Sequence, residues 1–210
     1  RKLGYRAYHL FVTMNNPKPE LEKKYVQKLV SYPFVRAVIK FNGGYDYEIA
    51  MVAKDLDELE SNMTKLYNGV DKYIKEGELL IVVKSFVSRA LPKKFLDLET
   101  KSKKVCKELK FDEKDKDILS VISNQATMPV YKVAEKLKLG VDTVKYRMKR
   151  MEDAGLIVKY MPGLNYSALG YQVYAILLRL NSLYEDVEAK LKAYISHDEN
   201  VLWAVKTIGK

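Results

Sequence analysis

Hydrophobic and polar positions alternate in blocks along the chain, and the period of each block predicts an element. The stretch "YRAYHLFVTM" is rich in aromatic and β-branched residues and ends at the breaker "NNPKP", which predicts a strand. In "PELEKKYVQKLVSYP" the apolar residues from Leu21 to Leu29 recur at helical spacing, and the helix must stop before Pro33. The pattern therefore begins with a strand and an amphipathic helix.

The following segments continue this alternation. "VRAVIKF" and "YDYEIAMVA" predict two strands that flank "NGG", whose glycines we expect to adopt the positive φ of a tight hairpin turn. "DLDELESNMTKLYNGV" predicts a helix with Asp55 as its N-cap, and "ELLIVVKSFVSRAL" predicts a further strand. The order β-α-β-β-α-β predicts an α+β fold class, with a ferredoxin-like domain over residues 1–92.

The chain repeats itself at a shift of 166 residues, so that "LGYRAYHLF" and "LGYQVYAIL" are two copies of one strand. Identical residues meet without a gap at Leu3, Gly4, Tyr5, Tyr8, Asn15, Glu22, Lys24, Val35, Lys40 and Gly43, which match Leu169, Gly170, Tyr171, Tyr174, Asn181, Glu188, Lys190, Val201, Lys206 and Gly209. Residues 168–210 thus predict the first half of a second ferredoxin-like domain. Its strand edges need a cover. We expect the chain to be a fragment of a longer protein, or else a partner chain to complete the sheet.

Between the two copies, residues 111–167 predict three helices. "DEKDKDILSVISNQ" starts at Asp112, "VYKVAEKL" is shorter, and a third helix over residues 141–154 follows the short break "KLG". On this third helix Val144, Met148 and Met151 share the side that faces a core. "GLIVKYMPGLNYSAL" is interpreted as a β wing. Three helices with a tight turn between the last two are typical of a helix-turn-helix.

Charge and cysteine content exclude several classes of protein. The formal net charge of +10 indicates an anionic partner. Its excess is densest over residues 93–110, with seven basic and three acidic groups, which predicts a basic linker that is either solvated or in contact with phosphates. Cys106 is the only cysteine, so neither an intrachain disulfide nor a thiolate metal site is possible. No signal peptide or apolar run of about 18 residues occurs, so we expect a cytoplasmic protein without a membrane partner.

The stretch "DEKDKDILSVISNQATMPVYKVAEKLKLGVDTVKYRMKRMEDAGLIVKY" resembles, over its full length, the winged helix-turn-helix of the leucine-responsive regulatory protein (Lrp/AsnC) family. The matching residues are Asp112, Asp115, Ile118, Leu119, Ala134, Glu135, Val144, Arg147, Glu152, Gly155 and Ile157. The "LGY" at 169–171 and the "GGYDY" at 43–47 resemble motifs of the family's ferredoxin-like effector domain. Thr127 and Gly140 depart from the family, which often has Arg and Ser there, so a phosphate contact and a capping hydrogen bond are not expected at these positions.

This resemblance implies a tandem protein in the order helix-turn-helix, effector domain, helix-turn-helix, effector domain. The present chain would lack the first helix-turn-helix and the end of the second effector domain. The implied function is sequence-specific binding of double-stranded DNA for transcription regulation, with helix 141–154 in the major groove. We expect phosphate contacts from Lys132, Lys145, Arg147, Lys149, Arg150 and Lys159, and base contacts from Asp142, Thr143 and Tyr146.

The resemblance also implies that the ferredoxin-like domains self-associate, as a homodimer, a larger oligomer or an intrachain pseudo-dimer, and can bind an amino acid or another small effector. The implied effector positions are Gly43, Gly44, Tyr45 and Asp46, with Asp46 as the partner for an amino group. The alternative interpretation is a hairpin turn that simply needs glycine.

No catalytic or metal site is predicted from the sequence. His9 and His197 have no ligand spacing between them, and we expect no cofactor and no enzymatic activity. Two alternatives remain open: an assembly module with a vestigial helix-turn-helix, and a tetrapyrrole (siroheme-type) decarboxylase of similar architecture.

Overall fold

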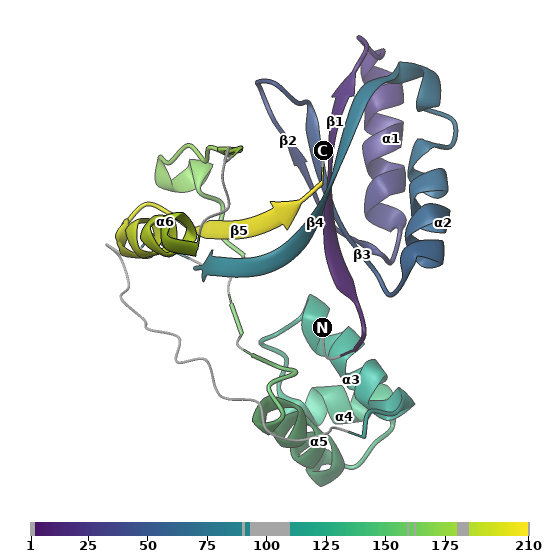
Figure 1. The fold of residues 1–210 in the computed structure, drawn as a ribbon. Helices are drawn as coiled ribbons and strands as arrows, with labels where there is room; N and C mark the ends of the chain where they lie inside the picture. Colours follow the sequence, from purple (N-terminus) through teal and green to yellow (C-terminus); the bar gives the residue numbers. More distant parts are fainter. Residues whose placement is uncertain are drawn as a thin grey trace. The chain divides into compact units, whose positions relative to one another are not determined.

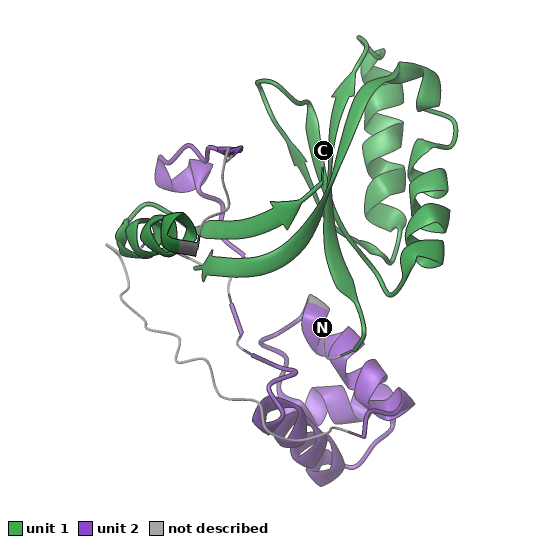
Figure 2. Cartoon of the chain, in the orientation of Figure 1, with its two compact units in different colours: residues 1–89, 184–210 green, residues 90–183 purple. Residues whose placement is uncertain are grey.

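The computed structural model describes residues 3–89, 91–92, 110–158, 160–161, 163–179 and 185–209, except for the side chains of residues 124 and 185. Residues 93–109 of the predicted linker lie outside this part of the chain. Contacts divide the chain into two compact units, residues 1–89 with 184–210 and residues 90–183 (Figure 2). The boundaries predicted at residues 92, 110 and 167 stay predictions.

The first copy in unit 1 has the predicted ferredoxin-like topology. Its elements are β1 (Arg6–Met14), α1 (Pro19–Ser31), β2 (Val35–Lys40), β3 (Tyr47–Ala53), α2 (Leu56–Tyr67), the short 3-10 helix η1 (Asp71–Tyr73) and β4 (Ile74–Ser88). The antiparallel sheet has the strand order β2-β3-β1-β4, and α1 and α2 lie side by side on one face of it (Figure 1). The α+β fold class and the β-α-β-β-α-β order are confirmed.

Local sequence explains where these elements begin and which face they bury. Pro19 begins α1, and the Asp55 side chain caps α2 by accepting a hydrogen bond from the Glu58 amide at 2.8 Å, as predicted. Successive strand side chains point to opposite faces. Leu10 and Val12 of β1 therefore pack against the helices in the core, whereas Phe11 between them faces the other side of the sheet.

The turn predicted at "NGG" is wrong in its detail. A six-residue loop, 41–46, connects β2 to β3, and neither Gly43 nor Gly44 has a positive φ. The loop is held open by bonds to β1: the Asp46 amide donates to the Val12 carbonyl at 2.9 Å, and the Met14 amide donates to the Asp46 carboxylate at 2.6 Å. These tertiary bonds replace the tight hairpin.

Unit 1 also contains elements of the second copy. α6 (Glu185–His197) and β5 (Trp203–Ile208) are the equivalents of α1 and β2, and β5 pairs antiparallel with β4. The prediction of a strand at "LGYQVYAIL" is wrong for this chain, because residues 171–179 form no strand. Their equivalent in the first copy, β1, lies between β3 and β4 and receives hydrogen bonds from both.

The repeat seen in the sequence reappears as a pair of matching ion pairs. In the first copy Lys40 of β2 contacts Glu22 of α1 at 2.7 Å, and in the second copy Lys206 of β5 contacts Glu188 of α6. These lysines and glutamates are equivalent at the shift of 166 residues. An equivalent ion pair therefore connects α1 to β2 in the first copy and α6 to β5 in the second.

Unit 2 contains α3 (Glu113–Asn124), α4 (Val130–Leu137), α5 (Val141–Asp153) and a short 3-10 helix, η2 (Ser167–Leu169). The three longer helices agree with the predicted ones. The described residues between 155 and 168 contain no strand, and residues 159 and 162 of the predicted β wing lie outside the described part of the chain. Gly155, at φ 63°, turns the chain after α5, and the Leu156 and Ile157 amides both donate to the Met151 carbonyl. Those bonds fold the segment back onto the helices.

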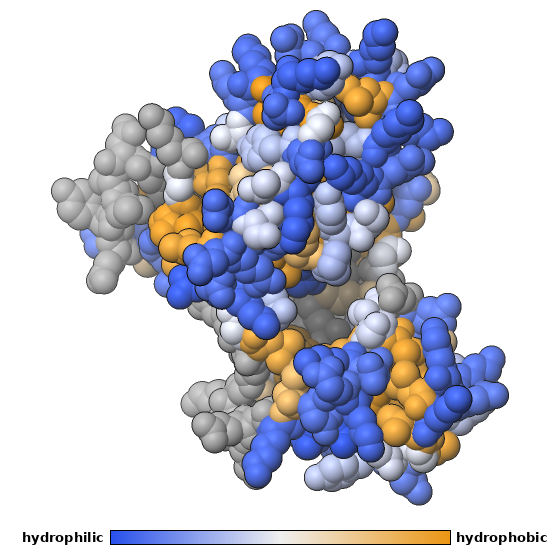
Figure 3. Space-filling model, turned by 90° about the vertical axis from the view of Figure 1, so that its right-hand side faces the viewer, coloured by the Kyte–Doolittle hydropathy of each residue, from blue (hydrophilic) through white to orange (hydrophobic). Residues whose placement is uncertain are grey.

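On the face drawn in Figure 3, hydrophilic side chains predominate and apolar ones form separate patches. Exposed apolar side chains are frequent in residues 171–179, at Val173, Tyr174, Ile176, Leu177 and Leu178. No helix in the described part of the chain has the length and apolar character that a membrane crossing requires.

Arg89, directly after β4, attaches the second copy to the first. Its guanidinium donates to the carbonyls of Asp198 and Val201 beyond the end of α6, each at 2.9 Å, and to that of Ser196 in the last turn of α6. Its own amide donates to the Leu202 carbonyl at 2.7 Å. A cation at the C-terminal end of a helix is favourable because the helix dipole is negative there.

We predict that Arg89→Met loosens β5. A hydrogen bond to a charged group contributes about 1.5 to 3 kcal/mol, so the amides of Trp203–Ile208 should exchange with solvent at least about tenfold faster in hydrogen-exchange mass spectrometry. Lys84→Met is the control, because it removes only the exposed ion pair with Glu188 and should change exchange little. Equal exchange in wild type and Arg89→Met would contradict this role.

Candidate nucleic-acid interface

The start of α3 is fixed by a reciprocal pair of aspartates. The Asp115 amide donates to the Asp112 side chain at 3.0 Å, and the Asp112 amide donates to the Asp115 side chain at 3.1 Å. This capping box satisfies two of the backbone amides that every helix start leaves without a partner. It also places two carboxylates one turn apart at the same helix end.

The turn between α4 and α5 is short and locally determined. Lys138 ends α4 in the left-handed conformation at φ 53°, and the Leu139 amide donates to the Ala134 carbonyl at 2.9 Å. Gly140 is the N-cap of α5 and offers no side-chain bond, as expected from its departure from the family pattern. Two residues of loop therefore separate the C-cap of α4 from the first residue of α5, as in a helix-turn-helix.

A core of aliphatic side chains holds the three helices together and orients α5. Val144 and Met151 of α5 are fully buried, and Met148 is partly buried against the same cluster. Ile118 of α3 and Val133 of α4 are the fully buried residues on the neighbouring helices. The predicted core side of the third helix is confirmed.

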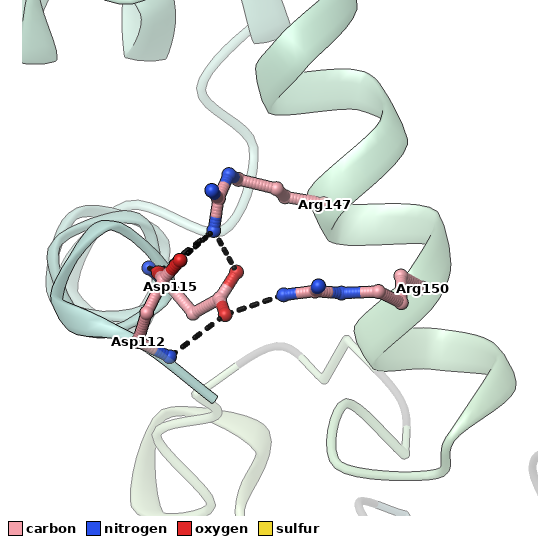
Figure 4. A network of polar contacts seen from close by, with 4 residues as sticks. All are labelled: Asp112, Asp115, Arg147 and Arg150. Carbon is pink, nitrogen blue, oxygen red and sulfur yellow. Dashed lines mark hydrogen bonds and ion pairs between the residues drawn. The ribbon is translucent and has the colours of Figure 1, made fainter. Parts of the chain in front are cut away.

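Two arginines of α5 reach the aspartates of α3 (Figure 4). One terminal nitrogen of Arg147 donates to Asp112 at 2.7 and 2.8 Å and to Asp115 at 2.9 Å. Arg150 donates to the other oxygen of Asp115, whose side chain has no exposed surface. The buried carboxylate thus receives two cationic donors, as a buried charge requires.

These contacts also change the titration of the groups involved. The hydrogen bond from Arg147, followed by that from the Asp115 amide, holds the pKa of Asp112 below its ordinary value. In return, the bonds to Asp112 and Asp115 raise the pKa of Arg147. Asp112 and Arg147 are therefore both ionised at neutral pH.

The remaining predicted residues of α5 lie on its outer side. Asp142, Thr143, Lys145, Tyr146 and Lys149 are exposed, and the Tyr146 side chain is among the most exposed large apolar groups of the unit at 66%. Lys149 is 70% exposed and makes an ion pair with Asp153 of the same helix at 3.5 Å. Lys132 of α4 is exposed as well, and Lys159 lies outside the described residues.

The structure thus separates the predicted cations into two groups. Arg147 and Arg150 are engaged inside the domain, whereas Lys132, Lys145 and Lys149 are exposed to solvent. Sequence reasoning missed the ion-pair network, although a signal was present. Aspartates three residues apart on one predicted helix and arginines three residues apart on another can face each other in pairs.

A groove of about 690 Å³ lies beside the start of α4. Thr127, Pro129 and Lys132 line it from the α3–α4 turn and α4, and Met161 and Gly163 line it from the segment after α5. Thr127 occupies the position where the family often has Arg. Lys132 is the cationic group in the lining, so the groove can accept an anionic group near the first turn of α4.

The predicted effector residues lie in the loop 41–46 of unit 1. The hydroxyl of Tyr45 donates to Glu78 of β4, and the Gly44 carbonyl accepts from the Thr13 hydroxyl at 3.3 Å. One oxygen of Asp46 is already occupied by the Met14 amide. Gly43 and Gly44 are exposed, with no atom within 4 Å of where a Cβ would be.

The two histidines have different partners. His9 of β1 bonds to Glu48 of β3, and both are buried, whereas the His197 ring bonds to the Ala193 carbonyl at 2.7 Å. Within the described residues, no group of histidine, cysteine and carboxylate side chains could hold a metal ion.

Comparison with known proteins supports the geometric description. A family model described as winged helix-turn-helix DNA-binding matches residues 111–158. The HTH-type transcriptional regulator LrpA of Pyrococcus horikoshii is 34% identical over 104 residues, which cover 45% of this chain and 73% of that protein. The chain belongs to the Lrp/AsnC family of transcriptional regulators. An uncharacterized HTH-type transcriptional regulator of Pyrococcus furiosus is 35% identical over 69 residues, which cover 33% of this chain but only 47% of that protein. The present chain therefore spans about half the length of that relative.

Among solved structures, the siroheme decarboxylase NirDL is similar over 74% of this chain and 44% of its own, at 15% identity and a TM-score of 0.46. Similarity at this level carries no conclusion about activity.

We predict that Asp115→Ala destabilises the helix-turn-helix by about 3 kcal/mol, because it leaves two arginines without their buried partner and removes half of the capping box. Native-state hydrogen exchange of the α3 and α5 amides measures the change. Asp153→Ala is the matched control, since that aspartate is exposed and contacts only Lys149 among the pairs described. Similar effects of both substitutions would contradict the central role of Asp115.

Proposed function

We propose that this protein is a sequence-specific DNA-binding transcriptional regulator that inserts α5 into the major groove of a duplex. The observation that carries the proposal is the outer side of α5. Its polar side chains are exposed while its opposite side is fixed by the core and by Arg147 and Arg150. A helix with a fixed inner side and a free outer side can enter the groove without reorganisation.

The exposed lysines supply the contacts to the DNA backbone. Lys145 and Lys149 on α5 and Lys132 at the groove beside α4 can each neutralise a phosphate and release a counterion. Arg147 and Arg150 do not contact the DNA directly in this proposal. If they turned away from Asp115, its buried carboxylate would lose its cationic partners. Their role in DNA binding is to hold α5 in position.

Base recognition falls to the residues near the start of α5. In helix-turn-helix proteins the N-terminal part of the recognition helix contacts base edges. Asp142, Thr143 and Tyr146 are exposed there. The Asp142 carboxylate can accept from the cytosine amino group, and the Thr143 methyl and Tyr146 ring can contact the thymine methyl.

The ferredoxin-like copies serve assembly. The support for this part of the proposal is the pairing of β5 with β4, which brings a strand of the second copy onto the first within one chain. Such pairing satisfies the β4 edge, which would otherwise be open to other chains. An intrachain pseudo-dimer can thus take the place of the homodimer, and larger assemblies can form from it.

The loop 41–46 is the proposed site for an amino acid or another small effector. Since one oxygen of Asp46 is bonded to the Met14 amide, the exposed backbone of Gly43 and Gly44 is the part of the loop that is open to a ligand. Thermal shift of the chain with and without a mixture of amino acids tests this site.

The two alternatives make different predictions. A tetrapyrrole decarboxylase would bind a coloured ring, and absorbance titration with a porphyrin would detect it. An assembly module with a vestigial helix-turn-helix would bind no duplex at low salt. No observation on the described residues favours either alternative over the regulator.

We predict that selection from random duplex DNA yields a preferred sequence, and that Lys149→Ala and Tyr146→Ala then act differently. Lys149→Ala should weaken binding to all duplexes and reduce the slope of log K against log salt by about 0.9, because one phosphate contact is lost. Tyr146→Ala should weaken the preferred duplex by about 1 to 3 kcal/mol and leave random DNA almost unchanged.

The matched control is Lys114→Ala, which removes an exposed lysine from α3 rather than from the outer side of α5. It should leave both the affinity and the salt dependence near wild type in fluorescence anisotropy. Equal losses for Lys114→Ala and Lys149→Ala would count against α5 as the DNA-contacting helix.

A further inference from the structure

β5 of the second copy pairs with β4, which is the edge strand of the first ferredoxin-like copy. β5 pairs with the second half of β4, from Ile81 to Ser88, and register shifts in this pairing accompany the bend of β4 in Figure 1. Two side-chain contacts cross the same junction: Lys84 of β4 contacts Glu188 of α6 at 3.0 Å, and Arg89 donates to three carbonyls near the end of α6. These contacts bind the two copies together.

Most of these contacts would also form if the first copy of a second molecule, and not the second copy of this chain, lay beside β4. β2 is the equivalent of β5 in the repeat, and its backbone offers the same hydrogen bonds to β4. Glu22 of α1 is the equivalent of Glu188 and could accept Lys84 in the same way. Arg89 binds backbone carbonyls, which every sequence has. β2 of a second molecule could therefore replace β5.

Trp203 breaks this equivalence. It is the first residue of β5, and its repeat equivalent is Ala37 of β2. The Trp203 ring packs against the His9 ring with centroids 5.0 Å apart and an angle of 35° between the planes. A methyl group at that position has no ring to place against the imidazole. The contact can therefore form only when β5 occupies the edge.

The surface that receives Trp203 is a buried polar pair. His9 and Glu48 are bonded to each other on the sheet face opposite α1 and α2, and they are 8% and 6% exposed. Polar groups in such a place are costly unless their surroundings are well packed and their hydrogen bonds satisfied. The indole is itself 49% exposed, so replacing it by alanine would uncover the imidazole to solvent. The His9–Glu48 pair is thus matched to an aromatic partner.

We propose that Trp203 directs β4 to pair with the second copy of the same chain and against pairing with β2 of another chain. The indole acts as the specificity-determining residue of the junction, and His9 with Glu48 forms its receptor. The inference rests on the proposed pairing of the two copies and is independent of DNA binding. Its test is therefore made without DNA, so that either proposal can fail alone.

The test uses engineered disulfides in the full chain with Cys106→Ser. Ser85 and Val205 face each other in the β4–β5 register, so Ser85→Cys with Val205→Cys reports pairing within a chain. Ile39 is the repeat equivalent of Val205, so Ser85→Cys with Ile39→Cys reports pairing of β2 with β4 of another chain. Within one chain β3 and β1 separate these two positions. Non-reducing gels after oxidation measure covalent dimers.

With Trp203 present, we expect an efficient intrachain disulfide between the cysteines at positions 85 and 205. We expect few covalent dimers from the cysteines at positions 85 and 39. Trp203→Ala should raise the ratio of interchain to intrachain disulfide about tenfold, the effect expected from losing one packed ring pair. Trp203→Phe keeps a ring over His9 and should stay near the parent. Combining Trp203→Ala with Ala37→Trp should make covalent dimers predominate.

Ala37→Trp alone keeps the test decisive if Trp203→Ala fails to fold, because Ala37 is exposed on β2 and tolerates a larger side chain. This variant should raise the covalent-dimer fraction above the parent while Trp203 still competes. An unchanged ratio in both Trp203→Ala and Ala37→Trp, with circular dichroism spectra like the parent, would overturn the proposal. So would a Trp203→Phe variant that forms as many dimers as Trp203→Ala.

Discussion

The buried carboxylate of Asp115 is the interaction on which the helix-turn-helix depends. It joins the start of α3 to two turns of α5 through Arg147 and Arg150, and it closes the capping box at the same time. Ion pairs contribute little when both partners are exposed, but one broken in the interior leaves an uncompensated charge. The orientation of α5, and with it the direction of every side chain offered to a duplex, is tied to this one group.

This arrangement changes how the positive charge of α5 should be understood. Charge counted along the helix makes Arg147 and Arg150 equivalent to Lys145 and Lys149, yet only the lysines are free of buried partners. Arginine suits the inner position because its planar group can donate to several carboxylate oxygens at fixed geometry. Lysine suits the outer one, because a flexible ammonium can follow the phosphates of different sequences.

A second constraint governs unit 1, where every strand needs a neighbour for its backbone hydrogen bonds. β5 meets this need on the outer edge of β4, whereas residues 171–179 form no strand despite their strand-like composition. Equivalent segments of the two copies therefore differ in local structure. Leu10 of β1 is buried in a sheet, whereas its equivalent, Ile176, is 80% exposed.

Much of this protein was determined by the sequence alone. Hydrophobic period located the strands and helices of the first copy and the three helices of unit 2, because each side of an amphipathic element follows from its spacing. Local capping placed Asp55 and Asp112 at helix starts, because the bonds involved span only a few residues. Only the tertiary structure decided three features: the six-residue loop 41–46 in place of a tight turn, the absence of a strand at residues 171–179, and the partners of Arg147 and His9. The groups in contact lie far apart in the chain: 32 residues separate Met14 from Asp46, and 39 separate His9 from Glu48. No periodicity or short motif records such a distance, so the sequence specified the elements while packing chose their partners.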